Sequence, residues 1–127
     1  MTLVDTSSWV EALRAGGRVD VRERVREVIL AGEAVWCDFV RLELWNGARG
    51  EYEKRKLAEL EREIPCLPIG DEVWALSVDL AKKCRTAGKT VPASDLLIAS
   101  CSFHHGASLE HCDLHFDIIQ KIHAGKS

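Results

Sequence analysis

Short apolar runs alternate along the chain with longer segments in which apolar residues recur every three or four positions. The short runs are typical of buried strands and cover residues 2–4, 34–36, 66–67 (within 64–69) and 107–109. The longer segments predict helices over residues 8–13, 21–30, 39–46, 52–63, 73–87, 92–105 and 114–123. Strands joined by helical crossovers form parallel sheets with helices on both faces. We therefore predict a three-layer α/β/α fold with a short central parallel sheet of four to five strands.

The length of the chain favours one hydrophobic core, because 127 residues lie near the common size of one domain. We expect a single domain over residues 1–127.

No apolar run approaches the ~20 residues that span a bilayer, and Asp5 stands where a secretory signal would need apolar residues. The five cysteines are odd in number and widely spaced, which is typical of reduced core thiols. These features predict a cytoplasmic protein with no membrane contact.

The net charge limits how the chain can meet nucleic acid. It is −3, whereas domains that hold nucleic acid by overall attraction are usually strongly basic. Any chemistry on nucleic acid must therefore depend on a local site.

Two aspartates stand where predicted strands give way to helices. Asp5 directly follows the first strand, and Asp113 comes shortly after the strand at 107–109. In open α/β sheets, ligands bind outside the carboxyl ends of the strands, so both acids are site candidates. The structural alternative for Asp5 is a helix cap.

Two further acids lie in apolar surroundings. Asp95 falls in the first turn of a helix whose following residues are nearly all apolar, and Glu43 is flanked by apolar residues on its own helix. The helix amino terminus alone could satisfy Asp95, and Glu43 could be an exposed or paired glutamate. If the carboxylates come together, they repel one another, and a divalent cation resolves that conflict.

Four segments surround these acids: LVDTS around Asp5, LELWNG around Glu43, GKTVPASDLLIA around Asp95 and CDLHFDII around Asp113. In this order, the four segments resemble PIN-domain ribonucleases, in particular VapC-type toxins of type II toxin-antitoxin systems. The resemblance implies a PIN-like fold and an acidic pocket in which these four residues hold one or two Mg²⁺ ions, with Mn²⁺ as a substitute. Such ions activate water for the hydrolysis of phosphodiester bonds, so the implied activity is that of a metal-dependent endoribonuclease. Thr6 and Ser7 orient Asp5 or a metal-bound water, or they simply cap the helix.

The resemblance also implies partners: an RNA substrate, a cognate antitoxin that covers the pocket, and a second copy of the chain in a homodimer. Aromatic and leucine side chains are either contact points for these proteins or core residues, namely Trp9, Trp45, Tyr52, Leu57 and Leu60. The basic candidates for RNA phosphate are Arg22, Arg24, Arg26, Lys54, Arg55, Lys56, Lys82, Lys83, Arg85 and Lys89.

The chain departs from the family pattern at two places. Many relatives carry a further aspartate two residues after the one matched by Asp113, and here that position is His115. Metal binding then rests on fewer carboxylates, or Asp117 contributes. The chain also ends soon after His123, so a fifth edge strand is either absent or very short.

Two other functions compete with the ribonuclease hypothesis. One is a Zn²⁺ site, since His111 and His115 would share a face if that segment were helical, with His104, His105 and Cys112 nearby. The other is a non-catalytic interaction module with a PIN-like fold. The presence of all four acids favours catalysis.

Overall fold

The computed structural model describes residues 1–125 and arranges four parallel strands in one sheet. Their order across the sheet is β3-β2-β1-β4, and the strands are β1 (Thr2–Val4), β2 (Ala34–Cys37), β3 (Cys66–Leu67) and β4 (Ser108–Glu110). Leu3 of β1 lies in register with Val35 on one side and with Leu109 on the other. Because the strands are parallel, their carboxyl ends meet at one edge of the sheet, where ligands bind in such folds.

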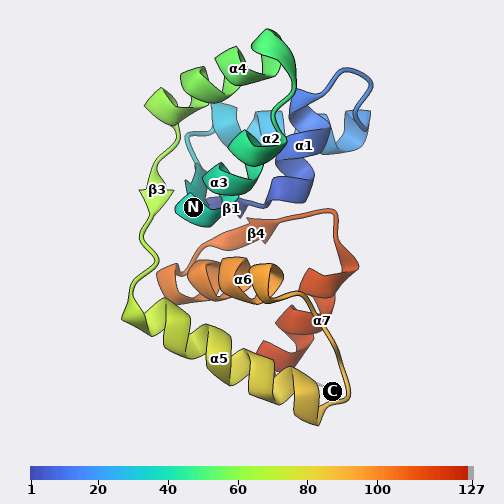
Figure 1. The fold of residues 1–127 in the computed structure, drawn as a ribbon, viewed down its shortest axis with the longest axis vertical. Coiled ribbons are helices and arrows are strands. Elements are labelled where there is room, and N and C mark those ends of the chain that lie inside the picture. The colour runs from blue at the N-terminus through green and yellow to red at the C-terminus, as the bar shows by residue number, and fades with distance from the viewer. Residues whose placement is uncertain (126–127) are drawn as a thin grey trace.

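Helices cover both faces of this sheet. They are α1 (Thr6–Leu13), α2 (Val19–Leu30), α3 (Asp38–Gly47), α4 (Gly50–Glu63), α5 (Asp71–Thr86), α6 (Ala93–His105) and α7 (Leu114–His123). Figure 1 shows α1, α2 and α4 on one side of the strands and α5, α6 and α7 on the other. Helix α3 packs against both α1 and α6 and so touches both layers. The predicted α/β class with a parallel sheet is confirmed.

The core is built from the strands and the inward faces of the helices. Leu3, Val4 and Trp36 from the strands are buried, as are Trp9 of α1 and Leu80 of α5. The rings of Trp9 and Trp36 lie 5.6 Å apart, centroid to centroid, in a tilted arrangement that favours aromatic packing. Helix α6 is buried from Leu96 to Ser102, as its apolar sequence predicts.

Every predicted strand and helix forms, with differences at the ends. Helix α1 begins at Thr6, two residues earlier than predicted, because Asp5 accepts a hydrogen bond from the backbone of Ser7 and caps the helix. Gly106 ends α6 in the left-handed conformation that glycine adopts without strain. Within residues 1–125 the sheet has four strands, so a fifth edge strand is absent from the described part of the chain.

The suggested contact residues differ in their exposure. Trp9 and Leu57 are buried in the core and are therefore unable to contact a partner, contrary to one of the two alternatives for them. Leu60 is partly buried and packs against the core. Tyr52 and Trp45 are exposed.

None of the helices between residues 1 and 125 is both long enough and apolar enough to cross a bilayer.

Candidate active site

Asp5 leaves β1 at the edge of the sheet and is held there by Ser7. Its Oδ2 accepts one hydrogen bond from the Ser7 backbone nitrogen at 3.0 Å and another from the Ser7 hydroxyl at 2.6 Å. The Ser7 hydroxyl also accepts a hydrogen bond from the backbone nitrogen of Cys112 at 3.1 Å. Asp5 is only 4% exposed, and this burial raises its pKa, although the Ser7 hydrogen bonds oppose the rise. Asp5 is thus a helix cap and a buried carboxylate at the same time.

Glu43 reaches the same region from α3 and is fixed by Thr6. The Thr6 hydroxyl donates a hydrogen bond of 2.7 Å to Oε1 of Glu43, which joins α1 to α3. Burial is the main reason that the pKa of Glu43 is raised; the Thr6 hydrogen bond opposes this effect, and the charge of Asp5 adds to it. Because Thr6 directly follows Asp5 in the chain, the Thr6 hydrogen bond also holds Glu43 near Asp5.

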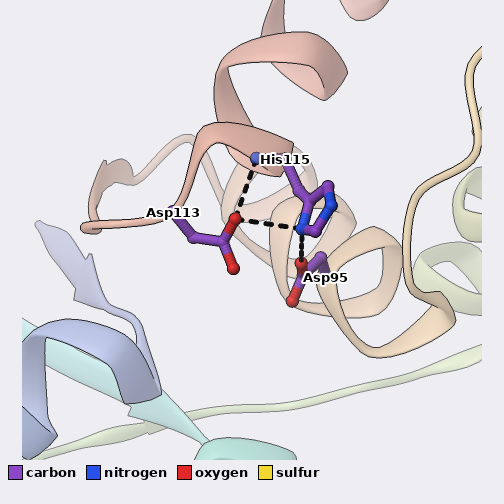
Figure 2. A group of neighbouring side chains, drawn as sticks. All are labelled: Asp95, Asp113 and His115. Atoms are coloured by element: carbon purple, nitrogen blue, oxygen red, sulfur yellow. Dashed lines mark hydrogen bonds and ion pairs between the residues drawn. The ribbon is translucent and has the colours of Figure 1, made fainter.

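Asp95, Asp113 and His115 form a second group, contributed by α6 and by the start of α7 (Figure 2). Asp113 caps α7, because its Oδ1 accepts a hydrogen bond of 2.9 Å from the His115 backbone nitrogen. Nδ1 of His115 lies 3.0 Å from Oδ1 of Asp113 and 3.3 Å from Oδ2 of Asp95. One potential ligand atom from each of the three residues falls within 4.8 Å of the other two.

Electrostatic coupling connects the two groups. The pKa of Asp95 is raised to about 6, mainly by burial and then by the negative charges of Asp113, Asp5 and Glu43, while His115 lowers it. The negative charges of Asp113, Asp5 and Glu43 therefore act on Asp95. The potential ligand atoms that lie within 4.8 Å of one another belong to Asp95, Asp113 and His115, and Asp5 and Glu43 lie outside that group.

The donor set fits a divalent cation. Oδ2 of Asp95 and Nδ1 of His115 are both shielded from solvent, and neither has a hydrogen-bond partner among the described residues. Carboxylate oxygens are the ligands that Mg²⁺ and Mn²⁺ prefer, and imidazole nitrogen is also a ligand of transition metals. A cation at this position would satisfy both atoms and reduce the repulsion that adds to the effect of burial on the Asp95 pKa.

Asp117, the suggested additional acid, lies elsewhere. Its Oδ1 is 3.6 Å from Nε2 of His111, and its side chain is largely exposed. It does not belong to the three-residue group of possible ligands. The position two residues after Asp113 reaches the cluster after all, but with the His115 imidazole in place of a carboxylate.

The histidines do not assemble as the zinc hypothesis required. Helix α7 begins at Leu114, so His111 precedes it and does not share a helical face with His115. His104 lies 3.1 Å from Glu72, and His105 hydrogen-bonds the backbone carbonyl of Pro68 at 2.8 Å. Cys112 contacts the Ser8 hydroxyl at 3.2 Å. These side chains thus belong to separate local contacts.

A polar network of Ser8, Arg24 and Glu110, which the sequence did not predict, lies beside the site. Ser8 is fully buried and donates a hydrogen bond of 2.6 Å to Oε2 of Glu110, while Arg24 donates one of 2.8 Å to Oε1. The backbone carbonyl of Glu110 in turn accepts a hydrogen bond from the Asp5 nitrogen at 2.9 Å. The network therefore joins the exit of β1, which carries Asp5, to the exit of β4, which leads to Asp113.

Two arginines beside the acids were also missed. Glu43 lines a cavity of about 290 Å³ together with Arg14 and Arg49. Neither arginine was among the basic residues suggested from the sequence, because only the folded chain brings residues 14 and 49 next to Glu43. Both residues are exposed and can meet an anionic ligand that approaches the acids.

Comparison with known proteins gives consistent matches along nearly the whole chain. The PIN domain family matches residues 2–122. The VapC ribonuclease Mb1587 of Mycobacterium bovis is 34% identical over 127 residues, which cover 96% of this chain and 93% of that protein.

Solved structures with a similar fold include FitAcB from Neisseria gonorrhoeae, with a TM-score of 0.75 and 22% identity over 94% of this chain and 92% of that one. VapBC-1 from nontypeable Haemophilus influenzae has a TM-score of 0.71 and 15% identity, again over 94% and 92%. At these identities the two structures support the fold of this chain and not its function. The family resemblance predicted from the four motifs is confirmed.

Proposed function

Because the chain belongs to the PIN domain family, we propose that it is a metal-dependent endoribonuclease and the toxin of a toxin-antitoxin pair. The observation that carries this proposal is the group of Asp95, Asp113 and His115, whose potential ligand atoms lie within 4.8 Å of one another. Burial, together with the negative charges of nearby acids, raises the pKa of Asp95 in this group to about 6. A fold that holds like charges together without a cation is destabilised by them. The ribonuclease name of the Mycobacterium bovis relative supports the same reaction.

Asp5, Glu43, Asp95 and Asp113 are the proposed catalytic and metal-binding residues, with Mg²⁺ or Mn²⁺ as the cation. Bound there, the cation would lower the pKa of a coordinated water and offset the charge that builds up on the phosphate. Thr6 and Ser7 have a positioning role, because each donates a hydrogen bond to one of the carboxylates and so fixes its orientation.

The RNA phosphate approaches the acids through the cavity beside Glu43. Arg14 and Arg49 line this cavity and supply positive charge next to a negatively charged cluster. This local arrangement allows a chain of net charge −3 to bind an anionic substrate. We place the reaction in the cytoplasm, which agrees with five cysteines that all remain free thiols.

The proposed protein partners are a cognate antitoxin and a second copy of the chain. The toxin assignment is supported by the resemblance of the four motifs to VapC-type toxins and by the VapC name of the Mycobacterium bovis relative. Exposed side chains such as Tyr52 and Trp45 offer apolar surface for such contacts.

Purified protein, freed of co-expressed partners, tests the reaction on a circular RNA, which only an endonuclease can open. We expect cleavage with Mg²⁺ or Mn²⁺, none in EDTA, and a loss of at least ~100-fold in Asp5→Asn and Asp95→Asn. Asp71→Asn is the matched control, because Asp71 lies in the first turn of α5 but is exposed. Intact RNA with every divalent ion would support the interaction-module alternative.

Growth of a bacterial host tests the toxin assignment separately. Expression of the chain without a partner should arrest growth, and Asp5→Asn should remove this effect at equal protein level. If growth continues at full rate while the purified protein cleaves RNA, the ribonuclease activity stands and the toxin role is rejected.

A further inference from the structure

We propose that Asp95, Asp113 and His115 form a mixed carboxylate–imidazole site that binds a divalent transition-metal ion, with Mn²⁺ preferred over Mg²⁺, and that His115 is a ligand. This inference rests on the proposed function, since it concerns the metal that the same acids would hold. It adds His115 as a ligand where the family pattern has an aspartate, and it adds the preference for Mn²⁺ over Mg²⁺ that follows from a nitrogen ligand.

The orientation of His115 is the first argument. Figure 2 shows the ring turned toward Asp95 and Asp113, with one nitrogen facing both carboxylates and the other pointing away. The facing atom, Nδ1, is enclosed and has no hydrogen-bond partner, although the side chain as a whole is 40% exposed. A ring that donates its outer N–H to water keeps a lone pair on the inner nitrogen, which is how histidines bind metals.

The unsatisfied carboxylate oxygen is the second argument. Oδ2 of Asp95 is also enclosed without a hydrogen-bond partner, and it lies 3.3 Å from Nδ1 of His115. Buried polar atoms normally have partners, so two adjacent atoms without any are an exception that needs an explanation. One cation between them would coordinate both atoms.

Ligand chemistry then gives the preference. Mg²⁺ takes oxygen ligands almost entirely, whereas imidazole nitrogen suits first-row transition metals. Replacing an aspartate by a histidine at this position removes one negative charge and adds one nitrogen ligand. Both changes weaken Mg²⁺ binding more than Mn²⁺ binding.

The competing interpretation is that a protonated His115 acts as a built-in counter-ion. Its distances to Asp113 and Asp95 would also suit an ion pair. In that case the imidazole would occupy the place of a metal ion, and a cation bound by the remaining acids would have no nitrogen ligand. The two interpretations therefore differ in whether a bound metal is in contact with nitrogen.

Pulsed electron paramagnetic resonance of Mn²⁺ bound to the metal-free full chain distinguishes them. We expect ¹⁴N modulation from a directly coordinated imidazole in the wild type, and its loss in His115→Asp and His115→Asn. His111→Asn is the matched control, because His111 lies four residues away and contacts Asp117 instead. It should keep the modulation.

Calorimetric titration of the same proteins with Mn²⁺ and Mg²⁺ tests the preference. The ratio of Mn²⁺ to Mg²⁺ affinity should fall at least about tenfold in His115→Asp, since even changes of outer-shell groups alter metal affinity by 10–100-fold. Mn²⁺ binding without ¹⁴N modulation, or an unchanged ratio in His115→Asp, would overturn this inference and leave the metal-dependent nuclease intact. A wild type that binds no divalent ion would overturn both.

Discussion

Replacing Asp95 by asparagine should make the metal-free protein more stable at neutral pH. The ionised Asp95 carboxylate is buried beside three other acids, and its pKa is raised from 3.8 to about 6. Asparagine has nearly the same shape but carries no charge, so it removes the cost of burying a charge and the repulsion from the other acids while it retains the packing. A destabilised carboxylate cluster is expected of a site that awaits a cation.

The pKa gives the size and the pH dependence of this effect. One pKa unit corresponds to about 1.4 kcal/mol, so the ionised Asp95 destabilises the fold by about 3 kcal/mol above pH 7. A raised carboxylate pKa means that the folded state holds its proton more tightly than the unfolded state. The penalty is therefore absent below about pH 3.8, grows between pH 4 and pH 6, and is about half complete at pH 5.

Urea unfolding in EDTA at pH 5 and pH 8 measures the difference between Asp95→Asn and wild type. The variant should be more stable by up to about 3 kcal/mol at pH 8 and by about half of that at pH 5. Asp71→Asn, at the exposed start of α5, should lose a few tenths of a kcal/mol or stay unchanged. An Asp95→Asn variant that is less stable than wild type at pH 8 would refute the conclusion that burial and the neighbouring acids destabilise the ionised Asp95 carboxylate.

Other perturbations test the remaining parts of the account. Mn²⁺ at about 100 times its dissociation constant should raise the free energy of unfolding of wild type by about 2.7 kcal/mol, as measured by urea unfolding without EDTA. The increase should be much smaller in Asp95→Asn. Thr6→Val should lower cleavage about tenfold because Glu43 loses its hydrogen bond, whereas Thr6→Ser should retain activity; equal rates would remove Thr6 from the site. Gly17→Ala should destabilise the fold by about 1–3 kcal/mol, because the added Cβ would overlap the carbonyl oxygen of Glu11. Gly47→Ala meets open space within α3 and should be neutral or stabilising by less than about 1 kcal/mol, so a similar loss in both variants would contradict the packing argument.

Sequence patterns predict the fold well because its elements are locally encoded. The apolar content of α6 and the glycine after it define that helix without knowledge of its neighbours. The first helix begins earlier than predicted because the cap, Asp5, acts on the backbone two residues ahead and extends the helix beyond its apolar pattern.

Three of the four acids could be placed near the carboxyl ends of the strands from the sequence, because Asp5 and Asp113 follow strands and Asp95 lies in the first turn of a helix. Glu43 lies further along its helix, and its place depends on how α3 packs.

The contacts that support the acids could not be placed from the sequence. Ser8 and Glu110 are 102 positions apart, and nothing in their local sequence pairs them. The orientation of His115 likewise depends on how α7 packs against α6, which only the tertiary structure shows.

Metal occupancy and RNA cleavage, measured in the same samples, test the central claim most directly. Protein stripped with EDTA is returned to increasing Mn²⁺, and each sample is divided between determination of bound metal and cleavage of circular RNA. The account predicts no cleavage without metal and a cleavage rate that rises in proportion to metal occupancy. At the same Mn²⁺ concentrations, Asp95→Asn should bind less metal and cleave less RNA than wild type. Cleavage at full rate in samples without bound metal would contradict it.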